Sequence, residues 1–345
     1  MLYRVIDAAE LPALVDAFME RYEVIAPVRS GRSFAFEAVG SFDDIVLDYP
    51  TTITSPKKYV LPPRETLFEF DAAANEVADF VEEVTPRVIF GVHACDINAL
   101  NSLDLVFRDA RYPDPYYAAR RDATMVVGIS CTPSEGCFCH LVDADEARTG
   151  YDLFLQDIGG RYLVSIGSVE AANILEGACN PREATDEDRI AFRHATRRRQ
   201  ASFNPDIPNI QEVPMLMDAF HSDPFWEELG GRCLSCTACS SVCPTCYCFD
   251  IRDTMDPDGV HGLRERTWDA CTSPQFAVVA GGHNFRADGR NRVRHRMYHK
   301  LNGFMAAHDR NLCVGCGRCV YACKAGISPI EVLRFFERKG ADDAD

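Results

Sequence analysis

The sequence predicts a two-part fold, with an N-terminal mixed α/β domain and a smaller C-terminal domain organised around cysteines. The length of 345 residues suggests two domains at roughly 150 residues each. Short apolar runs with both helical and strand-like spacing fill residues 1–203. Eleven of the 16 cysteines lie beyond residue 232. We therefore expect an α/β domain over residues 1–203 and a second domain over residues 215–345.

The N-terminal domain is predicted to begin with a helix and to continue with short strands. Apolar side chains recur at helical intervals over residues 11–22. Strand-like runs follow at residues 24–25, 33–39 and 45–47. A tight turn at Gly159 and Gly160 is expected to join two more strands into a hairpin, residues 151–156 and 161–166. Two helices complete the domain, at residues 168–176 and 186–200.

Two buried strands of this domain each lead to a cysteine. Residues 87–91 form an apolar run that leads to Cys95 and to a helix for which Asp96 is the expected N-cap. Residues 124–129 form a second apolar run, which ends just before Cys131. The carboxyl ends of parallel strands meet at one edge of a sheet. If the two strands are parallel neighbours, their cysteines converge.

A connector is predicted at residues 204–214. This segment contains three prolines and few apolar pairs, a composition typical of a linker. Beyond it, two cysteine clusters flank residues 244–312, and the chain closes with a helix at residues 329–338 and an acidic tail. The domain boundary is therefore expected at the connector.

Composition and motifs argue against several functions. The 36 Lys and Arg against 52 Asp and Glu give a net charge of −16, which argues against binding to nucleic-acid phosphates. No run approaches the roughly 18 apolar residues of a membrane span, and no secretory leader is visible, so we expect a cytoplasmic protein. Nucleotide-binding and zinc-hydrolase motifs and a catalytic triad are also not found. We assign no catalytic residue and interpret four histidines as structural: His93, His140, His261 and His283.

Two cysteine runs carry the strongest signal in the sequence. The first reads Cys233-Leu-Ser-Cys236-Thr-Ala-Cys239-Ser-Ser-Val-Cys243-Pro244. The second has the same spacing, with Cys313, Cys316, Cys319 and Cys323. A C-x2-C-x2-C-x3-C run is typical of 4Fe–4S sites in bacterial ferredoxins, whereas zinc usually takes two separate C-x2-C pairs. The sequence thus predicts two 4Fe–4S clusters in a ferredoxin-like domain with an insertion between its cluster motifs.

The fourth cysteine of each run is expected to bind the opposite cluster. Three thiolates in a tight turn reach one cubane, while the fourth, at the head of a following helix, points toward the other. We therefore assign the first cluster to Cys233, Cys236, Cys239 and Cys323, and the second to Cys313, Cys316, Cys319 and Cys243. Lys324 stands where the pattern has proline, a change expected to affect geometry rather than ligation.

A third site is predicted in the N-terminal domain. Four thiolates are expected to converge at the carboxyl edge of the sheet and to hold a third Fe–S cluster, those of Cys95, Cys131, Cys137 and Cys139. The alternative is that these cysteines are buried small apolar residues or reactive thiols. Iron content distinguishes the two interpretations.

Four further cysteines lie outside these groups. Cys246 and Cys248 follow the first run. One interpretation makes them extra ligands or a local thiol pair. The other, which we favour, makes them structural residues that pack near the cluster. Cys179 and Cys271 are isolated in the sequence and are interpreted as structural.

An arginine-rich segment lies between the two runs, at residues 286–300. Alternation over residues 292–297 indicates an exposed strand with a solvated charged face. Two functional alternatives stay open. Cations near a cluster stabilise its reduced form and raise its potential, and the segment is also suited to an acidic partner subunit.

The chain resembles a known family in several segments: residues 91–96, 114–117, 131–139, 243–250 and the two cluster runs. They are similar to the dicluster iron–sulfur subunit shared by cytosolic NiFe hydrogenases of the sulfhydrogenase type (β subunit) and anaerobic sulfite reductases (A subunit). The resemblance implies electron relay between a flavin subunit that binds NAD(P)H and a catalytic module, here the small and large NiFe hydrogenase subunits.

An electron-transfer subunit is the function that these patterns favour. One alternative is the equivalent subunit of an anaerobic sulfite reductase. Another is an oxidoreductase in its own right, with a flavin at the sheet edge where Cys95 and Cys131 are expected. A regulatory iron–sulfur module would need a target-binding element, and none is visible in the sequence.

Overall fold

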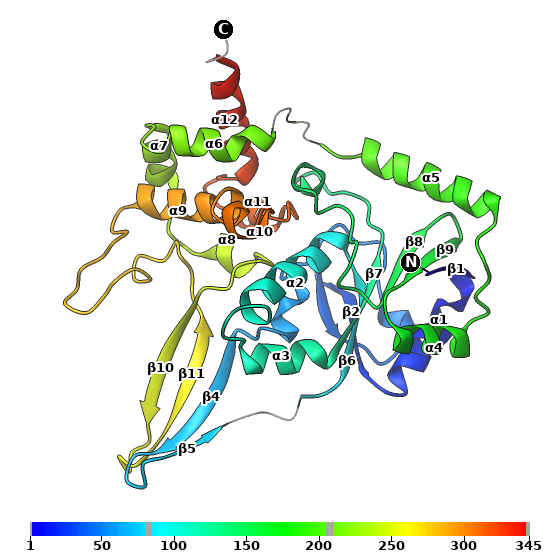
Figure 1. The fold of residues 1–345 in the computed structure, drawn as a ribbon, viewed down its shortest axis with the longest axis horizontal. Coiled ribbons are helices and arrows are strands. Elements are labelled where there is room, and N and C mark those ends of the chain that lie inside the picture. Colours follow the sequence, from blue (N-terminus) through cyan, green and yellow to red (C-terminus); the bar gives the residue numbers. More distant parts are fainter. Residues whose placement is uncertain (1, 80–83, 205–206, 208–209, 343–345) are drawn as a thin grey trace.

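A seven-stranded sheet forms the centre of the N-terminal part of the computed structural model, which describes residues 2–79, 84–204, 207 and 210–342 (Figure 1). The strand order is β1-β9-β8-β7-β6-β2-β3. The inner strands β2, β6, β7 and β8 are parallel, and the outer strands pair antiparallel. The strands are Leu2–Asp7 (β1), Glu23–Ser30 (β2), Ser33–Ala38 (β3), Arg87–Val92 (β6), Thr124–Ile129 (β7), Leu153–Asp157 (β8) and Arg161–Ile166 (β9).

Helices cover both faces of this sheet (Figure 1). Successive side chains of a strand point to opposite faces, so Val88 packs with Phe18 of α1 while Ile89 packs with Leu100 of α2. The helices of this part are Leu11–Met19 (α1), Ala94–Phe107 (α2), Pro115–Asp122 (α3), Val169–Ala178 (α4) and Asp186–Ala201 (α5). The sheet therefore lies between two apolar layers: α1 and α4 cover one face, and α2 and α3 cover the other.

A second sheet projects from the body and joins distant parts of the chain (Figure 1). Its antiparallel order is β10-β11-β4-β5. The strands are Arg64–Asp71 (β4), Glu76–Asp79 (β5), Phe249–Met255 (β10) and His261–Trp268 (β11). This sheet pairs strands from both sides of the expected boundary. The division into residues 1–203, 204–214 and 215–345 stays a prediction, and residues 205, 206, 208 and 209 of its linker lie outside the described residues.

Helices gather in the C-terminal part (Figure 1). They share one apolar core with the segment around Phe138. Trp226 and Phe336 are fully buried in that core. The helices are Val213–Ala219 (α6), Phe225–Arg232 (α7), Ala238–Ser241 (α8), Gly289–Leu301 (α9), Met305–His308 (α10), Arg318–Ala322 (α11) and Pro329–Asp342 (α12). The described residues also form five 3-10 turns: Ala8–Glu10, Phe42–Asp44, Pro56–Tyr59, Cys139–Val142 and Ile210–Glu212. No helix among residues 2–79, 84–204 and 210–342 is long and apolar enough to cross a bilayer.

The mixed α/β fold class is confirmed, and so are the predicted hairpin and the helices at residues 168–176 and 186–200. Three local predictions are wrong. Residues 45–47 form a loop and not a strand. The apolar side chains of Ile45 and Leu47 pack against the core, which explains the apolar pattern without strand pairing. Residues 292–297 lie in helix α9, whose period places every fourth residue on one face. His93, not Asp96, is the N-cap of α2.

Candidate metal centres

The first predicted group of cysteines lines one cavity. The structure brings together Cys233, Cys236, Cys239 and Cys323 around it. Cys233 directly follows α7, Cys239 lies in α8, and Cys323 directly follows α11. Backbone N–H groups point at two of the sulfurs, from Ser235 to Cys233 Sγ at 3.4 Å and from Ile327 to Cys323 Sγ at 3.3 Å. Such donors stabilise negative charge on a sulfur.

The second predicted group lines another cavity, which holds Cys243, Cys313, Cys316 and Cys319. Burial raises the pKa of Cys313 to about 11 and that of Cys316 to about 12. Cys243 behaves differently, because a hydrogen bond from the Cys246 thiol and nearby cations hold its pKa well below the ordinary thiol value. Each cavity therefore draws three cysteines from one run and the fourth from the other.

The two cysteine turns have the same backbone shape. Ser235 and Thr237 have φ of +51° and +63°, and Gly315 and Gly317 stand at the matching places with +61° and +76°. Glycine is required in the second turn for a further reason, since a Cβ on Gly317 would lie 2.5 Å from the Gly136 carbonyl oxygen. The second turn thus packs directly on the N-terminal cysteine segment.

Replacing Gly317 by alanine is expected to destabilise the protein by more than the ~1–2 kcal/mol of the left-handed conformation alone, because the Cβ also meets backbone. The midpoint of urea unfolding under anaerobic conditions measures this. Thr237→Ala is the matched control at the same backbone position, and we expect a change within ~0.5 kcal/mol. Equal losses in the two variants would contradict the close packing.

The third predicted group also comes together. The condition for its convergence holds, because β6 and β7 are parallel neighbours. Cys95 lies in the first turn of α2 and Cys131 follows β7. The sulfurs of Cys137 and Cys139 are 3.3 Å apart, and this contact, burial and the neighbouring Cys95 and Cys131 all raise the pKa of the Cys139 thiol. In residues 2–79, 84–204 and 210–342, no group of three or more His, Cys, Asp or Glu is placed to hold a single metal ion.

A buried ion pair joins the second and third groups. Arg318, in the second cysteine run, donates two hydrogen bonds to the Asp96 carboxylate in a bidentate ion pair, at 2.6 and 2.8 Å. Arg318 also donates to Thr52, and Ser55 donates to Asp96. The two charged side chains are only 2% and 0% exposed. Asp96, expected as a helix cap, instead holds the second cysteine turn against the N-terminal sheet.

The remaining cysteines are less isolated than their spacing suggests. Cys246 donates to Cys243, and Cys248 accepts a hydrogen bond from Cys271, which lowers the pKa of Cys248. Cys271 was expected to stand alone. Its contact follows from the antiparallel pairing of β10 with β11, because β10 begins just after Cys248 and β11 ends shortly before Cys271. Cys179 is buried and lies 3.8 Å from the Glu10 carbonyl oxygen.

In the described part of the chain, the four histidines interpreted as structural line neither of the two C-terminal cavities. His93 stacks on Tyr49 with ring centroids 4.0 Å apart, and burial lowers its pKa to about 4. The others make separate contacts: His140 with Phe203, His261 with Asp258, and His283 with Phe285.

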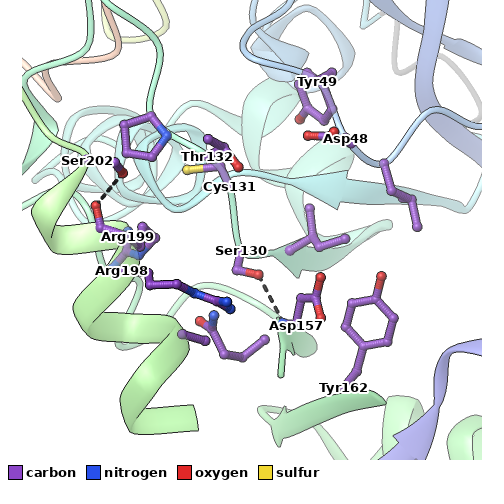
Figure 2. A pocket seen from close by; sticks show the side chains of 15 residues that line it. Asp48, Tyr49, Ser130, Cys131, Thr132, Asp157, Tyr162, Arg198, Arg199 and Ser202 are labelled. Carbon is purple, nitrogen blue, oxygen red and sulfur yellow. Dashed lines mark hydrogen bonds between the residues drawn. The ribbon is translucent and has the colours of Figure 1, made fainter. Parts of the chain in front are cut away.

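A pocket of about 510 Å³ opens beside Cys131 (Figure 2). It lies where β7 and β8 end, and Arg198 and Arg199 reach it from α5. The Arg199 guanidinium donates to the Cys131 sulfur, while burial raises the pKa of that thiol to about 11. Arg198 has no hydrogen bond or ion pair to any described residue. The pocket is thus a polar opening to the third group of cysteines.

Sequence comparisons agree with this arrangement. Residues 232–327 match the family described as a 4Fe-4S dicluster domain. The chain is 37% identical to sulfhydrogenase 2 subunit beta of Pyrococcus furiosus over 334 residues, 96% of this chain and 98% of the relative. No solved structure matches the chain significantly. The two predicted 4Fe–4S clusters are thereby confirmed. The chain belongs to the family of sulfhydrogenase β subunits.

Proposed function

We propose that this chain is the electron-transfer iron–sulfur subunit of a hydrogenase complex. The observation that carries the proposal is the pair of cavities, each lined by four cysteines drawn from both runs. The helices that bear the runs, α8 and α11, pack against each other. Two centres held this way are neighbours, and a neighbouring pair of one-electron carriers is suited to relay.

The cysteine sets fit the clusters that the family implies. We propose that Cys233, Cys236, Cys239 and Cys323 hold the first cluster and that Cys243, Cys313, Cys316 and Cys319 hold the second. Four thiolates are the usual ligands of a 4Fe–4S cluster, which supplies reversible one-electron chemistry when bound. The surrounding residues keep water out: Phe138, Met297 and Val314 line the second cavity.

We also propose a third Fe–S cluster at Cys95, Cys131, Cys137 and Cys139, beside the second. The Phe138 N–H donates to the Gly315 carbonyl at 2.8 Å, so the segment of the third group lies against the second turn. The expected electron path thus runs through all three centres in order.

The third site predicts the iron content. Anaerobically purified protein should contain about twelve iron atoms per chain, and Cys131→Ser should lower this to about eight. Cys179→Ser, which removes a buried cysteine outside the three groups, should leave the iron content unchanged. About eight iron atoms in the unsubstituted chain would remove the third site and leave the other two standing.

The partners that we propose are a flavin subunit that binds NAD(P)H and the small and large NiFe hydrogenase subunits, in the cytoplasm. Anaerobic purification of the tagged chain from its native host, followed by metal and flavin analysis, tests this. Nickel in the co-purifying subunits would agree with a hydrogenase. Siroheme would identify the sulfite reductase alternative instead.

One observation favours a second candidate function, a flavin-binding oxidoreductase. The pocket beside Cys131 has the volume of a small-molecule site and lies at the carboxyl edge of parallel strands. The Arg198 side chain lines this pocket and forms no ion pair with any described residue. Flavin released on denaturing the purified single chain would favour this candidate. A single chain without flavin would favour the relay.

A further inference from the structure

Four buried cations in the described part of the chain have no carboxylate partner. Lys57, Arg292, Arg296 and Lys300 are between 2% and 8% exposed, and none makes an ion pair with any described Asp or Glu. The other buried cations differ, since each is paired with Asp or Glu: Arg120, Arg266 and Arg318. Burying an unpaired charge is costly, so native proteins supply a countercharge.

Three of the four lie on one face of α9, the helix inserted between the two cysteine runs. Arg292, Arg296 and Lys300 are spaced four residues apart and so lie on the same side of the helix. The Arg292 guanidinium donates to Ser235 Oγ at 3.0 Å, in the first cysteine turn. This end of the helix therefore faces the first cavity.

The middle cation of α9 reaches both runs. Arg296 donates to the Cys239 carbonyl at 2.9 Å and lies 3.4 Å from the Cys246 sulfur. Arg296 also lines the second cavity, together with Lys300. Lys300 donates to Thr245 Oγ1 at 2.9 Å, two residues beyond the cysteine that crosses into this cavity.

The fourth cation comes from the N-terminal part of the chain. Lys57 extends its ammonium to the Cys246 carbonyl at 2.5 Å and lies over the Trp268 ring at 4.2 Å. Burial lowers the pKa of the Lys57 ammonium to about 8, and the nearby sulfurs of Cys246 and Cys243 oppose that shift. A free-standing domain built from residues 215–345 would lack this charge.

We propose that the buried face of α9, together with Lys57, is the built-in countercharge of the two clusters and makes the second cluster the easier one to reduce. This rests on the proposed function. A four-thiolate cluster is anionic and gains a further negative charge on reduction, so nearby cations favour the reduced form. Arg296 and Lys300 line the second site, and Lys57 reaches the Cys246 carbonyl three residues beyond Cys243 of that site. Arg292 and Arg296 reach the first cysteine run. Helix α9 supplies two cations to each site, so Lys57, which lies outside the insertion, is the added charge that sets the order of the potentials along the relay.

The test is an EPR-monitored redox titration of the anaerobically purified full chain. Lys57→Met and Lys300→Met should each lower the reduced-to-oxidised ratio of the second cluster about tenfold at fixed ambient potential, a shift of 59 mV for one electron. Arg292→Met should shift the first cluster instead. Lys58→Met is the matched control for Lys57, because Lys58 is more exposed and pairs with Glu37, and it should shift neither.

Unchanged potentials in Lys57→Met and Lys300→Met proteins with full iron content would overturn the proposal. If a methionine variant loses its cluster, Lys57→Arg and Lys300→Arg become the test. An arginine variant that retains the cluster supports the need for positive charge, and an arginine variant that loses the cluster contradicts it. Failure of the proposed function looks different, because the co-purified complex would then contain siroheme instead of nickel while the clusters of this chain stayed in place.

Discussion

Replacing Cys323 by serine should remove the cluster held by Cys233, Cys236 and Cys239 and leave the cluster of its own run in place. The physical reason is the crossed geometry: Cys323 directly follows α11 and lines the cavity of the first run. Iron should fall by about four atoms per chain, and the spectrum of one cluster should disappear.

Cys319→Ser is the control for this experiment. It lies in the same run, four residues earlier, but lines the other cavity. The two variants should therefore lose different clusters, which EPR of the reduced proteins distinguishes. If both variants lost the same cluster, each run would hold its own cluster and the crossed assignment would be wrong.

Replacing Asp96 by asparagine should destabilise the protein by ~3–5 kcal/mol, because it leaves the Arg318 guanidinium buried without its countercharge. The loss also loosens the second cysteine turn, since Arg318 stands between Cys316 and Cys319. The midpoint of anaerobic urea unfolding measures the first effect. Iron retention during dialysis measures the second.

Two comparisons separate charge from shape in this experiment. The double variant Asp96→Leu with Arg318→Met should be more stable than Asp96→Asn, because two matched apolar groups leave no unpaired charge. Asp122→Asn breaks an exposed pair with Arg108 and should cost less than ~1 kcal/mol. A loss of similar size at Asp96 and Asp122 would contradict the account of the buried pair.

Local patterns in the sequence predicted strands at six of the seven positions of the central sheet, β1 being the exception, and both C-terminal groups of cysteines. The runs at residues 87–91 and 124–129 became parallel neighbours because continuous apolar runs suit strands covered on both faces. The cysteine spacing was informative because three of the four cysteines that line each cavity lie within seven residues of one another in the sequence. The structure gathers Cys243 and Cys323 as the crossed assignment expects, and their ligation stays a prediction.

Contacts between distant segments could not be read from the sequence. The four-stranded sheet joins β4 to β11, and strand pairing across so many residues leaves no local signal. Lys57 and Asp96 act on the cysteine turns only through the tertiary fold. The helix α9 was not predicted, because alternation over residues 292–297 favours a strand, whereas cations acting on a cluster were one of the open interpretations of this segment. The spacing of Arg292, Arg296 and Lys300 was the signal for a helix with one cationic face.

Metal analysis with EPR of the anaerobically purified chain tests the central claim most directly. We expect iron and acid-labile sulfide in equal amounts, at least about eight of each per chain, and a reduced spectrum broadened by magnetic interaction between neighbouring clusters. A colourless protein with zinc as its bound metal would contradict the claim that the two cysteine cavities hold a pair of electron carriers.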